Sequence, residues 1–533
     1  MIPQRHIWIT ALCIAWILPG LIGHDPWKPD EAYTFGVVYE ILQGGSWVVP
    51  RLAGETFLAQ PPLFHLSAAA SAWLFSGLLP VHDAARLATG FYMALTFVFC
   101  GLAGRELHGV RHGVIAGLLL LGCFGLVVRG HQLINDAASL AGFAIAYYGL
   151  ALAVRRPAPA GFWIGTGMGL VFLTQGVLET AVIVLIAATL PLFGPWRSRG
   201  LAAAVASACA AAAPWLVIWP IMLHLESPVL LREWLWSENL ARLFAGDVIE
   251  AGLIYYLRLL PWYAWPVWPI ALWALWTART TGYSKPGIVL PIVGFVMTLA
   301  VLSSAPAREL YALPLLIPLT LLATPASHSL RRGAAGAWYW FSVMAFTFFM
   351  AVAWFYWTGL ELGVPARLHR HLHTIQPGYD PGFKWLPFTL AALYTLAWFG
   401  MIAGFRRSPQ RPLIVWAAGI TATWALLAIL FIGWIDTGKS YRSTVASLEQ
   451  ALPKNYDCIS SKHLGESQRA MLHYYAGIIT YREEANDRRK TCQLMLVQGQ
   501  PAYEAVPRGN WRKIWEGGRP RDRDELYRLY QRR

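Results

Sequence analysis

The sequence predicts a mainly α-helical polytopic membrane protein followed by a small α/β domain outside the membrane. Three features of the 533-residue chain support this class: 56% of its residues are hydrophobic, only 14% are charged, and 27 are tryptophan. A soluble chain carries roughly 25% charged residues, and indole rings concentrate where a membrane meets water. The net charge of +14 comes largely from basic pairs between apolar runs. A soluble enzyme and a nucleic-acid-binding protein are therefore excluded as descriptions of the whole chain.

Apolar runs divide residues 1–435 into about 13 predicted transmembrane helices, at about 20 residues for each crossing. No small-x-small cleavage site follows the first run, so we expect it to remain as the first span rather than to be removed as a signal peptide. The predicted spans are 7–23, 84–104, 113–129, 136–154, 160–176, 178–193, 200–222, 261–278, 286–303, 312–325, 336–358, 388–404 and 412–435.

Basic residues between the spans predict the orientation of the chain. If the apolar segment 61–79 lies in the interface instead of crossing, every basic cluster falls in a cytoplasmic loop, as the positive-inside rule requires. If that segment crossed, every cluster would lie outside. The clusters are Arg105 with Arg111, Arg155 with Arg156, Arg197 with Arg199, Arg279 with Lys285, Arg331 with Arg332, and Arg406 with Arg407 and Arg411.

The external side then receives two long loops, 24–83 and 223–260, and the region 436–533. That region is charged and has only short apolar patches, which predicts a small soluble domain. We expect this domain to lie in the external compartment. The compartment is oxidising, so Cys458 and Cys492 could form a disulfide, although two free thiols fit the sequence equally well.

The first candidate catalytic residues follow the first span directly. Asp30 and Glu31 place adjacent carboxylates at the membrane surface, with Tyr33 beside them. Apolar positions within 31–43 have helical spacing, which predicts a short helix lying in the interface. On a helix the two acids point about 100° apart, so they cannot share one role. An ordinary capping function at the start of the helix remains the alternative for Asp30.

Three further polar clusters fall on the same side of the membrane. Asp136 lies between the third and fourth spans, where helix capping is again the alternative. Arg308 and Glu309 stand at the mouth of a span, where charges facing lipid are costly and indicate function. Arg308 would bind an anion, and Tyr311 could donate to a phosphate or a sugar hydroxyl. The last cluster consists of Glu238, Asn239 and Arg242.

In their order along the chain, these motifs resemble the GT-C membrane glycosyltransferases, and most of all the bacterial lipid A aminoarabinose transferases, which are akin to the protein O-mannosyltransferases. No single motif is specific, but the ordered set covers most of residues 5–325, and the spans with an external domain also fit. The set is Pro-Asp-Glu-Ala from residue 29, Gly-x-Trp-Val-Val-Pro-Arg-Leu from residue 45, Pro-Pro-Leu from residue 61, Asp136, Phe-Leu-Thr-Gln-Gly from residue 172, Glu238-Asn239-x-x-Arg242 and Arg308-Glu309-Leu310-Tyr311.

The resemblance implies a glycosyltransferase that moves a sugar from a polyprenyl-phosphate donor to a lipid or cell-envelope acceptor on the external face. It implies that Asp30, with Glu31 beside it, is the base or holds the acceptor, and that Asp136 is the second carboxylate. A carboxylate can take the proton of an acceptor hydroxyl. The departing polyprenyl phosphate needs cationic donors.

Several positions depart from the pattern of the family. Relatives commonly carry lysine where Gln60 and Gln175 stand and arginine where Tyr33 stands, and a histidine downstream of Asn239 is missing. The metal site of some relatives has also lost both of its expected ligands here, so the ligand pattern does not support a possible divalent metal, and no cofactor is certain from the sequence. Binding of the donor phosphate would then involve Arg308, Tyr311, Arg242, Arg51, Gln60 and Tyr33, while Glu238, Asn239 and Glu309 would contact the acceptor or support the site.

Other functions remain open on the sequence alone. A transporter or flippase for an amphipathic solute would show charges near the membrane midplane and a structural repeat, and neither is visible. Replacement of the expected lysine by Gln60 would also fit a degenerate, non-catalytic family member. His369 and His373 have the spacing of a helical zinc site, but neighbouring arginines favour contact with lipid headgroups instead.

Overall fold

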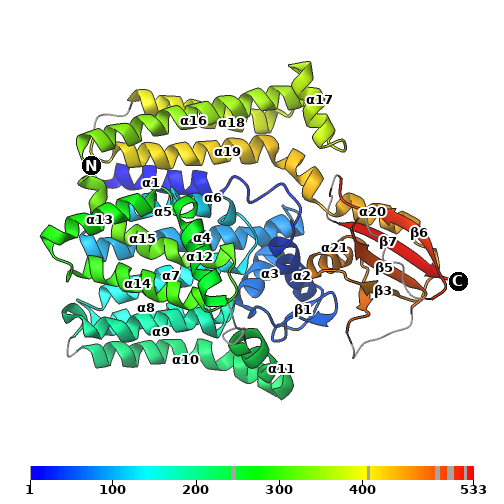
Figure 1. The fold of residues 1–533 in the computed structure, drawn as a ribbon, viewed down its shortest axis with the longest axis horizontal. Helices are drawn as coiled ribbons and strands as arrows, with labels where there is room; N and C mark the ends of the chain where they lie inside the picture. Colours follow the sequence, from blue (N-terminus) through cyan, green and yellow to red (C-terminus); the bar gives the residue numbers. More distant parts are fainter. Residues whose placement is uncertain are drawn as a thin grey trace.

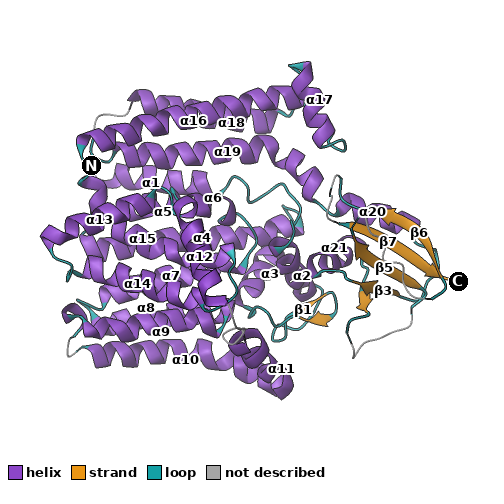
Figure 2. Cartoon of the chain, in the orientation of Figure 1, coloured by secondary structure: helices purple, strands orange, loops and turns teal. Residues whose placement is uncertain are grey.

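The computed structural model describes residues 2–533 except 198–199, 242–247, 405–407, 486–491, 501–508, 521 and 523–524. A helical bundle carries a small sheet domain at one end (Figure 1), and strands are few outside that domain (Figure 2). The main helices of the bundle are α1 Ile2–Ile17, α4 Val81–His108, α5 His112–Leu121, α6 Phe124–Arg129, α7 Asn135–Leu152, α8 Pro157–Gln175, α9 Val177–Thr189, α10 Leu201–Glu226, α12 Val248–Tyr263, α13 Val267–Thr281, α14 Pro286–Ser303, α15 Leu316–Ala323, α16 Arg332–Glu361, α18 Trp385–Gly404 and α19 Arg411–Lys439.

These helices follow the predicted spans closely, and the predicted fold class is confirmed. Predicted span 113–129 is divided into α5 and α6, and the first helix ends at Ile17 instead of residue 23. Within the described part of the chain, six helices are long and apolar enough to cross a membrane by themselves. The total of about 13 spans stays a prediction, because several other helices are near the lower limit of roughly 17 residues for a crossing.

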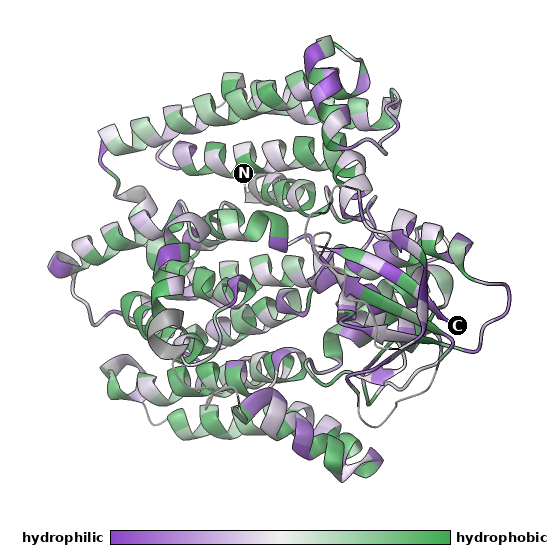
Figure 3. Cartoon of the chain, turned by 45° about the vertical axis from the view of Figure 1, so that its right-hand side comes forward, coloured by the Kyte–Doolittle hydropathy of each residue, from purple (hydrophilic) through white to green (hydrophobic). Residues whose placement is uncertain are grey.

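Hydrophobic side chains cover much of the outside of the bundle, as a lipid-facing surface requires. Hydrophobic residues run along the helices, many of them exposed, whereas hydrophilic residues gather at helix ends and on the C-terminal domain (Figure 3). Small residues let two of the helices approach closely: a Cβ on Gly161 of α8 would lie 2.2 Å from the carbonyl oxygen of Ala204 in α10. Such contacts between small residues replace the hydrophobic effect as a packing force within lipid.

The segment between α1 and α4 forms two short helices and a hairpin. Helix α2 (Asp30–Leu42) matches the predicted helix, and α3 (Leu63–Phe75) lies within the ambiguous segment 61–79. At about 1.5 Å per residue, a helix of this length reaches only about 20 Å and cannot cross a bilayer core of about 30 Å. Between them, β1 (Arg51–Leu52) pairs with β2 (Glu55–Thr56). Helix α2 does not lie on an open membrane surface, since most of its side chains are buried.

The C-terminal domain is a five-stranded sheet with two helices, and its strand order is β4-β3-β5-β7-β6. The neighbours of β3 are both parallel to it, which requires a crossover, and α21 supplies it between β3 and β4. Strands β5 to β7 pair antiparallel. The elements are α20 Arg442–Ala451, β3 Ile459–Lys462, α21 Glu466–Ala476, β4 Thr480–Arg482, β5 Leu494–Gly499, β6 Trp511–Gly517 and β7 Leu526–Arg532.

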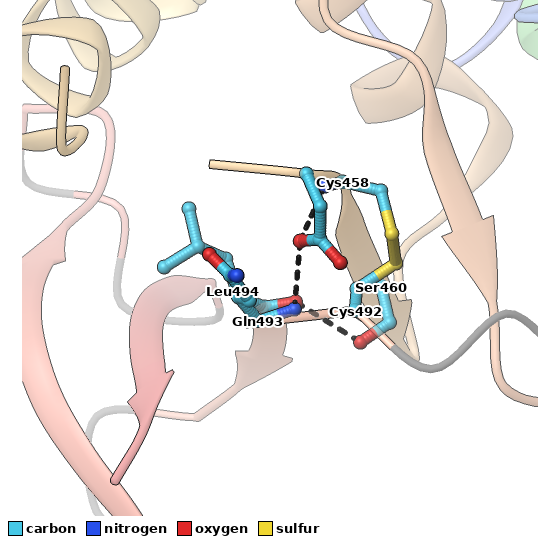
Figure 4. The surroundings of a disulfide bond; sticks show 6 residues. Cys458, Ser460, Cys492, Gln493 and Leu494 are labelled. Atoms are coloured by element: carbon cyan, nitrogen blue, oxygen red, sulfur yellow. Dashed lines mark hydrogen bonds between the residues drawn. A yellow bond between two sulfur atoms is a disulfide. The ribbon is translucent and has the colours of Figure 1, made fainter. Parts of the chain in front are cut away.

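Of the two states that the sequence allows for Cys458 and Cys492, the structure contains the disulfide. It joins the residue before β3 to the segment that leads into β5 (Figure 4). Beside it, the Asp457 carboxylate accepts hydrogen bonds from the N–H groups of Cys458 and Gln493. Covalent and hydrogen-bonded links therefore hold two central strands together at one end of the sheet.

Candidate functional site

Asp30 is the first residue of α2, and its carboxylate faces the bundle instead of capping the helix. No side-chain hydrogen bond caps this helix. The Tyr33 hydroxyl, one helical turn further on, donates to Asp30 Oδ1 over 2.8 Å. The guanidinium of Arg308 contacts the same oxygen. Asp30 is only 8% exposed, so the capping alternative does not describe the contacts that its side chain makes.

Arg308 reaches Asp30 from a segment 278 residues further along the chain. It precedes the 3-10 helix Glu309–Leu315, and its Nη2 also donates to the Tyr33 hydroxyl over 3.1 Å. Burial opposes the charge of Arg308, but Tyr33 and Asp30 outweigh it and raise the pKa of the guanidinium. Burial and the charge of Asp30 likewise raise the pKa of Tyr33. The cluster is therefore a carboxylate, a neutral phenol and a fixed cation.

Tyr256 of α12 makes two hydrogen bonds with the backbone of Arg308. Its hydroxyl accepts a hydrogen bond from the Arg308 N–H over 3.2 Å and donates to the Arg308 carbonyl over 3.4 Å. The side chain is completely buried. Sequence reasoning did not single out this tyrosine, because no local pattern shows which backbone group it contacts.

We expect Tyr256→Phe to lower transfer activity about five- to tenfold while the protein folds normally. The phenylalanine fills the same space but leaves the Arg308 N–H and carbonyl without their partner, and a hydrogen bond contributes about 0.5–1.5 kcal/mol. Steady-state kinetics of the purified variant measures the effect. Activity equal to that of the wild type would show that the backbone of Arg308 needs no such support.

Glu31 points away from Asp30, as the helical geometry predicts. It is fully buried and accepts hydrogen bonds from Arg86 Nε over 3.0 Å and from the Leu133 N–H over 2.9 Å. Burial opposes ionisation, but Arg86 outweighs it and the pKa of Glu31 is lowered. This ion pair joins α2 to α4 and to the loop before α7, and it is separate from the cluster at Asp30.

Asp136 lies in the first turn of α7 and is buried. Arg308 and Asp30 lie close enough for their charges to act on its carboxylate. The structure thus brings the second predicted carboxylate within electrostatic range of the first, although 106 residues separate them in the chain. Gln175, the position at which the family resemblance implies a lysine, also acts on the carboxylate of Asp136.

Glu309 forms a two-pronged ion pair with Arg129 of α6. Arg129 Nε and Nη2 donate to the two carboxylate oxygens of Glu309 over 3.1 and 2.8 Å, and Arg129 Nη1 donates to Gln132 over 2.8 Å. Sequence analysis did not propose Arg129 as a site residue. The signal was available, because an arginine at the end of an apolar span is costly unless it is paired.

The other predicted phosphate-binding residues lie in different surroundings. The Tyr311 ring centre is 5.8 Å from the guanidinium carbon of Arg308. Arg51 is exposed on β1. Gln60 is 7% exposed, and its Oε1 has no hydrogen-bond partner within the described part of the chain. Arg242 falls outside the described residues.

Asn239 has a clear structural function. It belongs to a short π-helix, Trp234–Leu240; its Oδ1 accepts from the Val177 N–H over 2.8 Å, and its Nδ2 donates to the Trp234 carbonyl over 2.8 Å. The side chain therefore satisfies a free N–H at the start of α9. Glu238 is half-buried, and its charge acts on Glu466 of the C-terminal domain.

Among the described residues, no three His, Cys, Asp or Glu side chains come together as a metal-binding group. The rings of His369 and His373 do meet on α17 (Ala366–Ile375), edge to face, with centres 5.2 Å apart. However, His369 Nδ1 already lies 3.0 Å from the carbonyl oxygen of Gly359, so that ring anchors α17 to the end of α16.

An apolar cavity of about 730 Å³ lies within the helical bundle. Side chains of α16 and α19, such as Phe349 and Trp424, form most of its wall. Its polar lining includes Gln132, His371 and Lys439. Since Gln132 also accepts a hydrogen bond from Arg129, the cavity adjoins the Arg129–Glu309 pair. The volume and apolar wall of the cavity would suit a hydrocarbon chain.

Comparison with known proteins places this geometry in context. No protein-family model matches the sequence. The chain is 27% identical over 293 residues to the undecaprenyl phosphate-alpha-4-amino-4-deoxy-L-arabinose arabinosyl transferase 1 of Pseudomonas fluorescens, which covers 49% of this chain and 50% of the relative. It is 26% identical over 449 residues to the corresponding transferase of Pseudomonas aeruginosa, covering 80% and 76%. The chain thus spans about half the length of the Pseudomonas fluorescens relative in the aligned region.

A solved structure is similar over nearly the entire chain. The crystal structure of ArnT from Cupriavidus metallidurans bound to undecaprenyl phosphate has a TM-score of 0.72, with 16% sequence identity, and covers 99% of this chain and 98% of ArnT. The apo structure of the same protein gives a TM-score of 0.70. The chain therefore has the GT-C fold of ArnT and resembles in sequence the bacterial undecaprenyl phosphate aminoarabinose transferases.

Proposed function

We propose that this protein is a glycosyltransferase of the periplasmic face of a bacterial inner membrane. It transfers a sugar from a polyprenyl-phosphate donor to a lipid or cell-envelope acceptor. The names of the relatives suggest undecaprenyl phosphate-linked aminoarabinose as the donor, and the resemblance suggests lipid A as the acceptor.

The observation that carries this proposal is the meeting of Asp30, Tyr33 and Arg308 at one end of the bundle, with Asp136 beside them. A carboxylate and a fixed cation within contact distance are the two groups that the reaction needs. Asp30 can take the proton of the acceptor hydroxyl. Arg308 can stabilise the negative charge of the departing polyprenyl phosphate.

The contact between Asp30 and Arg308 also suggests how donor binding prepares the base. Without donor, the guanidinium is the partner of the carboxylate. A phosphate competes well for arginine because it accepts two parallel hydrogen bonds. Donor binding would draw Arg308 away from Asp30 and leave the carboxylate free to accept the proton of the acceptor.

The neighbouring groups then have supporting functions. Glu31 and Arg86 fix α2 against α4, so we assign Glu31 to positioning instead of chemistry. Glu309 holds Arg129, which sets the polar edge of the apolar cavity through Gln132. The cavity supports a lipid-linked substrate, because a soluble sugar nucleotide has no apolar chain to place there.

Transfer by the purified protein tests this function. We expect wild-type protein in proteoliposomes to transfer 4-amino-4-deoxy-L-arabinose from undecaprenyl phosphate to lipid A, with the product identified by mass spectrometry. Asp380→Asn is the control for removal of the carboxylate in Asp30→Asn. Asp380 is exposed on the loop after α17, so its substitution should leave transfer unchanged.

Other results discriminate between the remaining functions. Transfer from a different undecaprenyl-phosphate sugar, but not from the aminoarabinose donor, would keep the glycosyltransferase and change its substrate. A wild-type protein that binds undecaprenyl phosphate but transfers no sugar from any such donor would contradict the proposal and support the non-catalytic alternative. Movement of the lipid between leaflets without transfer would support the flippase.

A further inference from the structure

We propose that the C-terminal domain holds the Asp30 helix in its working position through α21, with Gly36 and Ala470 as the positioning contact. The expected effect on the transfer rate rests on the proposed function, whereas the contact between α21 and α2 does not depend on it. It gives the C-terminal domain a positioning part in the reaction, although no hydrogen bond or ion pair joins its described residues to Asp30.

Helix α21 lies against α2 and contacts both of its ends. At the start, the Ser467 hydroxyl donates to the carbonyl of Pro29, the residue just before Asp30, over 2.9 Å. Near the other end, His473 Nδ1 lies 3.5 Å from the carboxylate of Glu40. Ser467 and Pro29 are 438 residues apart in the chain, so the contact between α21 and α2 is a tertiary contact and not a local turn.

The middle of the crossing depends on a glycine. A Cβ added to Gly36 would lie 2.5 Å from the Cβ of Ala470 and 3.4 Å from its Cα. Real Cβ atoms do not approach so closely, so any side chain at Gly36 must push the two helices apart. Only the Ala470 methyl creates the severe overlap, because the next atom, in Leu52, is 3.5 Å away.

The C-terminal domain also forms ion pairs with the hairpin of β1 and β2 that follows α2. Arg469 of α21 and Arg482 of β4 both contact the Glu55 carboxylate, with their Nη2 atoms at 3.1 and 2.7 Å. Glu55 precedes Phe57, whose ring packs on Tyr33 with centres 5.7 Å apart. Through Phe57, these ion pairs therefore also support the position of Tyr33, whose hydroxyl donates to Asp30.

Displacement of α2 would move Asp30 relative to Arg308, which is fixed by a different part of the bundle through Tyr256. A misplacement of about 1 Å can cost about 10²-fold in rate. The substrate-binding cavity is formed by other helices, so a shift of α2 should change kcat more than KM.

The test moves one methyl group across the contact. We expect Gly36→Ala to lower kcat at least tenfold while KM for the donor changes less than about threefold. The double variant Gly36→Ala/Ala470→Gly should recover most of the lost kcat, because the overlap is removed. Gly400→Ala in α18 is the control, since an added Cβ there meets no atom within 4 Å, and it should behave as wild type.

Hydrogen–deuterium exchange gives a second readout that needs no transfer activity. Amides of α2 should exchange faster in Gly36→Ala than in the wild type and return toward the wild-type rate in the double variant. If the wild type transfers no sugar, this measurement still decides whether α21 braces α2. Unchanged exchange and kinetics in Gly36→Ala, or a double variant that recovers neither, would overturn the inference.

Discussion

An Asp30→Asn protein is expected to lose roughly 10²–10⁴-fold in turnover, the range that a general base contributes. Asparagine has nearly the size of aspartate and can still accept hydrogen bonds from Tyr33 and Arg308. It cannot take a proton from the acceptor. Single-turnover transfer with saturating donor measures this loss directly, and the elution profile and melting temperature of the protein report whether it still folds.

The capping alternative predicts a different result for the same protein. Asparagine caps a helix about as well as aspartate, so activity would survive if Asp30 only began α2. A well-folded Asp30→Asn protein with near-normal turnover would remove Asp30 from catalysis. In that case Asp136, the neighbouring carboxylate, would be the next residue to substitute.

The second large effect is expected at Arg308. Arg308→Ala should cost about 2–4 kcal/mol of transition-state stabilisation and should raise the donor concentration needed for half-maximal rate. The guanidinium is the cation that contacts Asp30, and Gln60 stands where relatives supply a lysine. Steady-state kinetics with varied donor, together with undecaprenyl phosphate binding, measures both consequences.

Arg308→Lys separates charge from geometry. Lysine keeps the positive charge but lacks the planar fork that binds a phosphate through two hydrogen bonds, so we expect an effect between those of the wild type and Arg308→Ala. Arg367→Ala on α17 is a suitable control for loss of a cation, because this exposed arginine lies away from the cluster. Unaltered donor kinetics in Arg308→Ala would exclude Arg308 from phosphate recognition.

The helices of the bundle and α2 could be predicted because they depend on local patterns. An apolar run long enough for a bilayer gives a helix almost wherever it occurs, and the apolar spacing of 31–43 predicted α2 to within one residue of its bounds, Asp30–Leu42. The angle between Asp30 and Glu31 followed from the same geometry. Their different surroundings, one at Arg308 and one at Arg86, agree with it.

The partners of the charged residues could not be predicted in the same way. Arg129 and Glu309 are 180 residues apart, and Arg86 and Glu31 are 55 apart. Hydropathy shows that each charge needs a partner but not which one, since that depends on how the helices are ordered in the bundle. For the same reason Asn239 stood among possible substrate contacts, although it caps α9.

The contact between α2 and the C-terminal domain joins an early part of the chain to the part that is synthesised last. The Pro29 carbonyl is held by Ser467, which emerges 438 residues later, and at about 5–20 residues per second this delay is about 20–90 s. During that time α2 has been made but lacks the partner that covers it. Under the proposed function, α2 gains the contacts that hold Asp30 in position only when the C-terminal domain has been made and folded, so we expect a partly synthesised protein to be inactive.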